Sequence, residues 1–262
     1  MAERAASNVE TPARTLLVVV GVAVVCAMLV SLTAVNLRPR YTANLEAYRL
    51  GQLESILDAL SQRGYPVAAQ DIEARVVELA SGRYSDKLKP ATFDARKAAA
   101  DPGTSVAIPA DRDVAALKRR AIHATVFLVR DAGRNVTLII LPVYGVGYQS
   151  TLRGFLALEG DTSKVLALRF YEQGDTPGLG ARIQDPSWEA MWDAKRVYDD
   201  SGALRLGVAR GPVPRGSEDA AYMVDGISGA TRTSRGVHQL LRFWLGDFGF
   251  GPYLERVRQG KG

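Results

Sequence analysis

The stretch that decides how this chain is interpreted is Val224-Asp225-Gly226-Ile227-Ser228-Gly229-Ala230-Thr231-Arg232-Thr233-Ser234. An apolar approach turns through two glycines into a hydroxyl-rich segment, and a helical pattern follows. The apolar residues on one face of that helix are Val237, Leu240, Leu241 and Trp244. Glycines let a backbone approach a ligand, and free amides at a helix start favour an anion. The pattern predicts a phosphate-binding turn, or alternatively a Ser/Thr-rich helix start that caps itself.

The pattern Asp-x-x-Ser-Gly-Ala-Thr, from Asp225 to Thr231, resembles the attachment motif of flavin-binding domains whose last threonine carries FMN through a phosphoester bond. The resemblance implies that the side-chain oxygen of Thr231 is bonded to the 5′-phosphate of FMN. It also implies that a separate flavin transferase recognises Asp225 when it attaches the cofactor. The expected cofactor-binding residues in this segment are Asp225, Ser228, Gly229, Ala230, Thr231 and Thr233.

A second segment, Gly174 to Ile183, resembles the Glu-Thr-Pro-Gly-Leu-Gly loop that packs against the flavin in these domains. Asp175 stands where that loop usually carries glutamate, so the charge is kept but the reach is shorter. The residues that the resemblance implies to line the ring or the ribityl chain are Asp175, Thr176, Pro177, Gly178, Leu179 and Gly180.

Two further segments narrow the resemblance to one branch. Leu141 to Leu158 is similar to a second family signature, which usually carries tryptophan near Tyr148 or Gln149. Phe243 to Leu254 resembles the tail of the C subunit of sodium-translocating NADH:quinone oxidoreductases. This implies an electron-transfer protein whose partners are the other membrane subunits of a complex that couples electron flow to sodium export. The alternative is the G subunit of an Rnf-type electron-transport complex, which shares the Thr-Pro-Gly-Leu-Gly and Ser-Gly-Ala-Thr strings.

Composition limits the other possibilities. The 262 residues, 47% hydrophobic, suit one membrane anchor and one domain of about 200 residues. The only cysteine is Cys26 and the only histidines are His123 and His238, which argues against disulfides, iron-sulfur clusters and metal sites. The net charge of +5 forms no basic stripe interleaved with aromatic residues, so nucleic-acid binding receives little support.

The run from Thr15 to Leu37 contains 23 residues without a charge, enough to cross a bilayer. A cleaved signal peptide is the alternative, but its apolar region is typically about 7 to 15 residues long. Arginines flank the run on both sides, so charge does not fix the orientation. The resemblance implies a bacterial inner membrane with the large domain on the periplasmic side. The expected division is 1–14 tail, 15–37 transmembrane helix, 38–60 helical stalk and 61–262 FMN-binding domain.

Periodicity predicts an α+β domain with a mainly antiparallel sheet after this single N-terminal transmembrane helix. The stalk helix is expected over residues 42–60 with Thr42 as its cap. Residues 131–135 are expected to join two strands in a hairpin, and residues 87–113 to form an irregular connector. The strands are expected at residues 75–79, 124–130, 136–143, 164–171 and 204–209, with a helix at 186–192 capped by Asp185.

Two functions of other classes compete with the flavin hypothesis. Gly226 to Ala230 approximates the Gly-x-Ser-x-Gly turn of serine hydrolases, with alanine in the last position. That reaction needs a base, and His238 lies only ten residues beyond Ser228, while His123 lies upstream. A purely structural membrane-anchored protein is the second competitor. Trp188, Trp192 and Trp244 are expected to be core or interface residues rather than flavin stackers.

Overall fold

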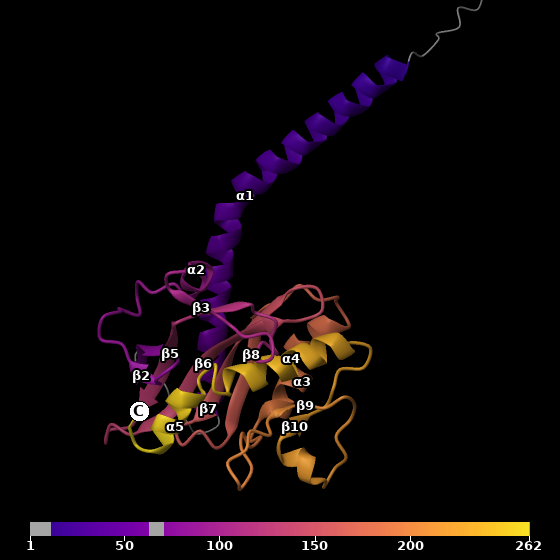
Figure 1. Ribbon diagram of the computed structural model, residues 1–262. Coiled ribbons are helices and arrows are strands. Elements are labelled where there is room, and N and C mark those ends of the chain that lie inside the picture. The colour runs from indigo at the N-terminus through magenta and orange to yellow at the C-terminus, as the bar shows by residue number, and fades with distance from the viewer. Residues whose placement is uncertain (1–11, 63–70, 262) are drawn as a thin grey trace, which may run out of the picture. The chain divides into compact units, whose positions relative to one another are not determined.

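The computed structural model describes residues 12–62 and 71–261 (Figure 1). The chain divides into two units, residues 1–49 and residues 50–262, which are described separately. The expected tail, residues 1–14, lies mostly outside the described residues. In the first unit, residues 12–37 have a mean hydropathy of 2.8 and are long and apolar enough to cross a membrane. Their side chains are exposed, as an anchor in lipid requires.

Helix α1, Pro12–Gln62, runs without interruption through the predicted anchor and the predicted stalk. The expected helix start at Thr42 is therefore wrong. A cap satisfies amides that a helix start leaves free, and position 42 lies inside a helix whose backbone continues on both sides. Pro39 also lies inside the helix, although its missing amide removes one backbone hydrogen bond there.

A six-stranded sheet forms the centre of the second unit, in the order β2-β1-β5-β6-β7-β8. Every neighbouring pair is antiparallel, which confirms the predicted α+β class. The turn at residues 131–135 joins β5 to β6 as expected. The strands are β1 Ile72–Glu78, β2 Arg83–Tyr84, β5 His123–Arg130, β6 Val136–Val146, β7 Thr151–Glu159 and β8 Val165–Glu172.

Alternation along the strands gives the sheet two apolar faces. In β6, Ile139 and Leu141 contribute to one core cluster while Leu138 and Ile140 contribute to the other. The first cluster lies under α4 (Thr231–Trp244) and α5 (Gly251–Arg258), and the second takes in the last turns of α1. Figure 1 shows α4 lying across the sheet. Adjacent residues of a strand point to opposite faces of the sheet. Because consecutive residues here are apolar, both faces must be covered, and helices cover them.

The predicted irregular connector at residues 87–113 is wrong in two places. Residues Ala95–Ala100 form helix α2. Asp94 caps its start, because the Asp94 carboxylate accepts hydrogen bonds from the backbone amides of Arg96 and Lys97 at 2.9 and 3.2 Å. Residues Ser105–Ala107 form β3, which pairs with β4, Arg119–Ala121. Two of the three residues of β3 are exposed, so no apolar alternation in the local sequence marks this strand. It forms because it pairs with β4.

The elements between β8 and α4 are short. The predicted helix at 186–192 is split into α3, Pro186–Glu189, and the 3₁₀ turn η3, Ala190–Trp192. Asp185 occupies the N-cap position of α3 as expected, but its side chain makes no capping bond, and its carboxylate pairs with Arg182 at 3.1 Å. The predicted strand at 204–209 is reduced to β9, Gly207–Val208, which pairs in parallel with β10, Met223–Val224. The 3₁₀ turns η2, Gly180–Gln184, and η4, Glu218–Ala221, complete the region.

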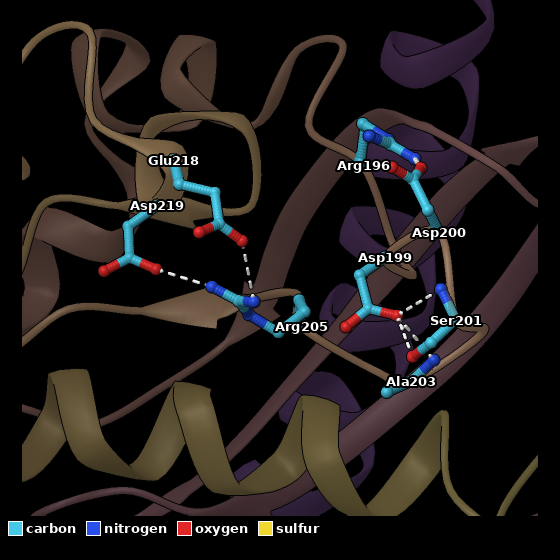
Figure 2. Close-up of polar contacts among 8 residues, drawn as sticks. All are labelled: Arg196, Asp199, Asp200, Ser201, Ala203, Arg205, Glu218 and Asp219. Carbon is cyan, nitrogen blue, oxygen red and sulfur yellow. Dashed lines mark hydrogen bonds and ion pairs between the residues drawn. The ribbon is translucent and has the colours of Figure 1, made fainter.

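Charged side chains hold the segment that leads into β10 (Figure 2). Arg205 donates to Glu218 at 3.0 Å and to Asp219 at 2.9 Å. The guanidinium groups of Arg205 and Arg196 also lie 5.0 and 5.3 Å from the ring centroid of Tyr222. Exposed ion pairs of this kind contribute little individually. Together they fix the course of the chain just before it reaches Asp225.

Candidate functional site

Helix α4 begins at Thr231 without a side-chain cap. Ala230 occupies the cap position, its side chain has no polar atom, and no side-chain cap bond forms. Thr233 instead donates to Asp175 at 2.6 Å, and Ser234 Oγ accepts the amide of Ile227 at 2.9 Å. The alternative of a self-capping helix start is therefore not observed. An uncapped first turn presents amides that favour an anion.

Two glycines give the turn before α4 its shape. Gly229 has a φ of +76°, a conformation that residues with a Cβ rarely adopt. A Cβ on Gly226 would lie 2.5 Å from the carbonyl oxygen of Ala209, which is too close for any side chain. Ser228 and Gly229 are exposed, so the turn stands at the surface with Thr231 directly after it.

Asp225 lies at the start of this turn and is bound within the fold. Its Oδ1 accepts the amide of Val213 at 2.8 Å, and its carbonyl oxygen accepts the indole N–H of Trp188 at 3.0 Å. Trp188 and Trp192 are both buried, with ring centroids 5.3 Å apart in an edge-to-face contact. Their burial, like that of Trp244, confirms that the three tryptophans are core residues.

Asp175 joins three segments that are distant in sequence. The residue is 4% exposed, and its carboxylate accepts the amides of Tyr148 and Gln149 at 3.2 and 3.0 Å. It also accepts the hydroxyl of Thr233 in α4 at 2.6 Å. A Cβ on Gly180 would lie 2.5 Å from Thr233 Oγ1, so glycine leaves room for this contact. The shorter reach of aspartate therefore suffices to connect the second signature, its own loop and α4.

The three connected segments line a half-open cavity of about 480 Å³. Seven of the predicted residues line it: Thr176, Leu179, Gly180, Gly229, Ala230, Thr231 and Thr233. Five others are not part of its lining: Asp175, Pro177, Gly178, Asp225 and Ser228. Of these, Asp175 is buried and Asp225 is half-buried, and both accept hydrogen bonds within the fold.

Tyr148 and Arg232 complete the lining and were not predicted as cofactor contacts. Tyr148 is 49% exposed and Leu179 is 43% exposed, so large apolar surface borders the cavity. The guanidinium carbon of Arg232 lies 5.3 Å from the ring centroid of Tyr148. Tyr148 lies within the second family signature, and this position is the feature of the sequence that could have indicated a contact with the cofactor. Arg232 lies one residue beyond the last position of the attachment motif, so the motif did not indicate it.

The geometry does not support a serine nucleophile at Ser228. His238 Nδ1 accepts the amide of Val208 at 3.3 Å, and burial lowers the pKa of this imidazole. His123 begins β5 and pairs with Glu78 of β1 in the sheet register. Within the described residues, neither histidine is hydrogen-bonded to Ser228, so the base that a hydrolase requires is not in place.

Comparison with known proteins agrees with this geometry. The FMN-binding domain family matches residues 147–246, which contain every residue that lines the cavity. The C subunit of the Na⁺-translocating NADH-quinone reductase from Pseudomonas aeruginosa is 42% identical, over 97% of this chain and 99% of that protein. Its counterpart from Vibrio parahaemolyticus is 40% identical, over 97% and 98%. These relatives favour the quinone reductase branch over the Rnf alternative.

Two solved structures share the fold. The crystal structure of Shewanella oneidensis NqrC matches with a TM-score of 0.66 and 34% identity, covering 73% of this chain and 86% of that one. The structure of the corresponding reductase subunit from Parabacteroides distasonis matches with a TM-score of 0.52, over 82% and 92%. At 22% identity the second comparison supports the fold alone.

Proposed function

The chain belongs to the NqrC family, the C subunits of Na⁺-translocating NADH-quinone reductases, and from that premise we propose that it carries FMN and transfers electrons within such a complex. The observation that supports this most directly is the cavity beside Thr231, assembled from the three segments that resemble flavin-binding motifs. Its volume of about 480 Å³ falls within the range of about 300 to 1,000 Å³ that is usual for small-molecule sites.

The residues of the cavity suit the two ends of FMN. The phosphate end is an anion, and the uncapped start of α4 and the hydroxyl of Thr231 lie together in one wall. The ring is flat and largely apolar, and Tyr148 and Leu179 offer exposed apolar surface. When bound, FMN supplies one- and two-electron chemistry, while the chain holds it and sets its surroundings.

We propose that the attachment is covalent, through a phosphoester bond between Thr231 Oγ1 and the 5′-phosphate. Thr231 is exposed, lines the cavity and is the first residue of α4, so its hydroxyl is accessible to a modifying enzyme. A tether keeps the cofactor at high local concentration where loose FMN would be lost. A flavin transferase is the proposed modifying partner, with Asp225 as part of what it recognises.

The remaining partners follow from the anchor. The run from Thr15 to Leu37 has no charged residue, so it offers no path for an ion. We therefore propose that sodium moves through other membrane subunits and that this chain neither binds NADH nor reduces quinone by itself. The proposed location is a bacterial inner membrane, with residues 61–262 on the periplasmic side. Copurification of the tagged chain with several membrane subunits tests this assembly, and a solitary chain with full NADH:quinone activity contradicts it.

The decisive experiment is to coexpress the full chain with a competent flavin transferase. Flavin fluorescence should remain with the polypeptide after denaturing electrophoresis, and the fragment containing Thr231 should carry one FMN by mass. The matched pair of variants is Thr231→Val and Thr176→Val, because both threonines are exposed and line the same cavity. We expect no label in the first and full label in the second. Full labelling of Thr231→Val contradicts attachment at this residue.

Asp225→Asn separates recognition from attachment. The substitution keeps the acceptor hydroxyl of Thr231 and an oxygen that still accepts the amide of Val213. We expect slow or incomplete labelling with near-native circular dichroism. Wild-type labelling rates in this variant would show that the transferase does not depend on the charge of Asp225.

A further inference from the structure

Arg232 is the one charged residue that lines the cavity, among the residues that the structure describes. It follows Thr231 directly and is exposed to solvent. Its guanidinium is therefore the nearest cation of the cavity wall to a flavin tethered at Thr231. The other lining residues are neutral and contribute only dipoles to the cavity.

Tyr148 keeps this cation at the wall. The guanidinium carbon lies 5.3 Å from the ring centroid of Tyr148, within the range of a cation–π contact. The backbone of this tyrosine is held in place, since its amide donates to the buried carboxylate of Asp175 at 3.2 Å. An arginine held on an aromatic face loses less freedom in each contact than a flexible lysine does. Arg232 is therefore held beside the cavity rather than left free in solvent.

We propose that Arg232, positioned by Tyr148, raises the reduction potential of the flavin in this cavity. The inference rests on the proposed function, because it requires FMN at Thr231. Reduction brings electrons onto the ring, and any negative charge that the ring then keeps is stabilised by a nearby cation. Screening at physiological ionic strength acts over about 8 Å, so a charge in the cavity wall is only partly screened. Arg232 is thus a positioning and tuning residue, distinct from the attachment group.

The size of the effect follows from this exposure. A fully buried charge would shift the equilibrium strongly, but solvent reduces the influence of an exposed one. We expect Arg232→Gln to lower the ratio of reduced to oxidised flavin about fivefold at a fixed ambient potential. For a two-electron couple this is a fall of about 20 mV in midpoint potential, because a tenfold change in the ratio corresponds to about 30 mV.

The matched control is Arg235→Gln. Arg235 is exposed, lies three residues further along α4 and does not line the cavity. Its loss changes the net charge of the chain by the same amount. Tyr148→Leu leaves the charge of Arg232 but removes its aromatic support, and Arg232→Lys keeps the charge but not the planar group. We expect Arg235→Gln to leave the potential unchanged, and the two others to lower it by less than Arg232→Gln does.

The test is a reductive titration with dithionite against a reference dye, followed by flavin absorbance, on full chains whose FMN content has been measured by mass. The difference between wild type and Arg232→Gln should shrink when salt is raised from about 50 mM to about 500 mM. An unchanged potential in Arg232→Gln overturns the proposal, as does an equal fall in Arg235→Gln. A wild-type chain that carries no FMN contradicts the proposed function itself, and with it any role of Arg232.

Discussion

Replacing Asp175 tests whether one buried carboxylate assembles the cavity. Its two carboxylate oxygens accept the amides of Tyr148 and Gln149 and the hydroxyl of Thr233. Asp175→Ala removes both oxygens and with them all three hydrogen bonds. A buried donor left without a partner, such as the hydroxyl of Thr233, costs about 1 to 3 kcal/mol, and hydrogen bonds to a charged group are stronger than neutral ones. The amides of Tyr148 and Gln149 are partly buried. Because water from the adjacent cavity can reach some of these donors, we expect a total loss of about 3 to 5 kcal/mol.

Asp175→Asn should cost less. The amide oxygen can still accept one backbone N–H, but its NH₂ group would face the amide of Tyr148 or Gln149, and two donors do not bond. The hydroxyl of Thr233 can rotate to accept from that NH₂ group. We therefore expect a loss of about 1 to 2 kcal/mol, roughly that of one mispaired buried hydrogen bond.

The assay is urea unfolding of the full chain in detergent, followed by the fluorescence of the buried tryptophans. Asp247→Ala is the control, because this aspartate is exposed and should show no measurable change. The order of stability should be wild type, then Asp175→Asn, then Asp175→Ala. A loss below about 1 kcal/mol in Asp175→Ala would refute the reasoning, because it would mean that the three contacts do not hold the segments together.

Three further predictions concern packing and pH. Gly180→Ala should lower both stability and flavin labelling, because its Cβ would lie 2.5 Å from Thr233 Oγ1, and unfolding with gel fluorescence checks both. Burial lowers the pKa of His238, so its contribution to stability is present above the ordinary pKa of about 6.5 and is lost as pH falls through the lowered value. Urea unfolding between pH 8 and pH 5 should show a smaller acid loss in His238→Gln. Burial outweighs the attraction of Arg169 and raises the pKa of Glu189 to about 7, so its contribution is present at low pH and lost as pH rises through that value. Glu189→Gln should weaken this loss between pH 5 and pH 8 in the same assay.

The parts of the fold that sequence predicted are those with local signals. The apolar spacing of Val237, Leu240 and Leu241 predicted α4, and all three are buried. The polar turn at 131–135 predicted the hairpin between two strands rich in β-branched residues. In both cases the pattern that drives burial lies within one continuous segment, where its period can be read.

The errors come from interactions between distant segments. The strand Ser105–Ala107 forms because it pairs with residues 119–121, and nothing within its three residues indicates that pairing. The strand expected at 204–209 kept only Gly207–Val208, since its partner β10 is itself two residues long. A local pattern cannot measure the length of a partner strand.

The same limit applies to the site. Motif resemblance named the threonine and the loop, and seven of those residues line the cavity. It did not indicate the hydrogen bond between Asp175 and Thr233, because the two residues are 58 positions apart and come into contact only in the folded chain. It also did not indicate Arg232, whose proposed role depends on its contact with the ring of Tyr148.

In the proposed site, one residue would hold the cofactor and different segments would orient it. Thr231 begins a helix whose inner face is buried, so a tether there rests on a rigid element of the core. The walls that would contact the ring come from loops, and Asp175 connects those loops to α4. Thr231 variants should therefore lose FMN while keeping the fold. Asp175 variants that still fold should keep FMN but hold it less firmly, which visible circular dichroism of the flavin would register as a weaker signal at equal loading.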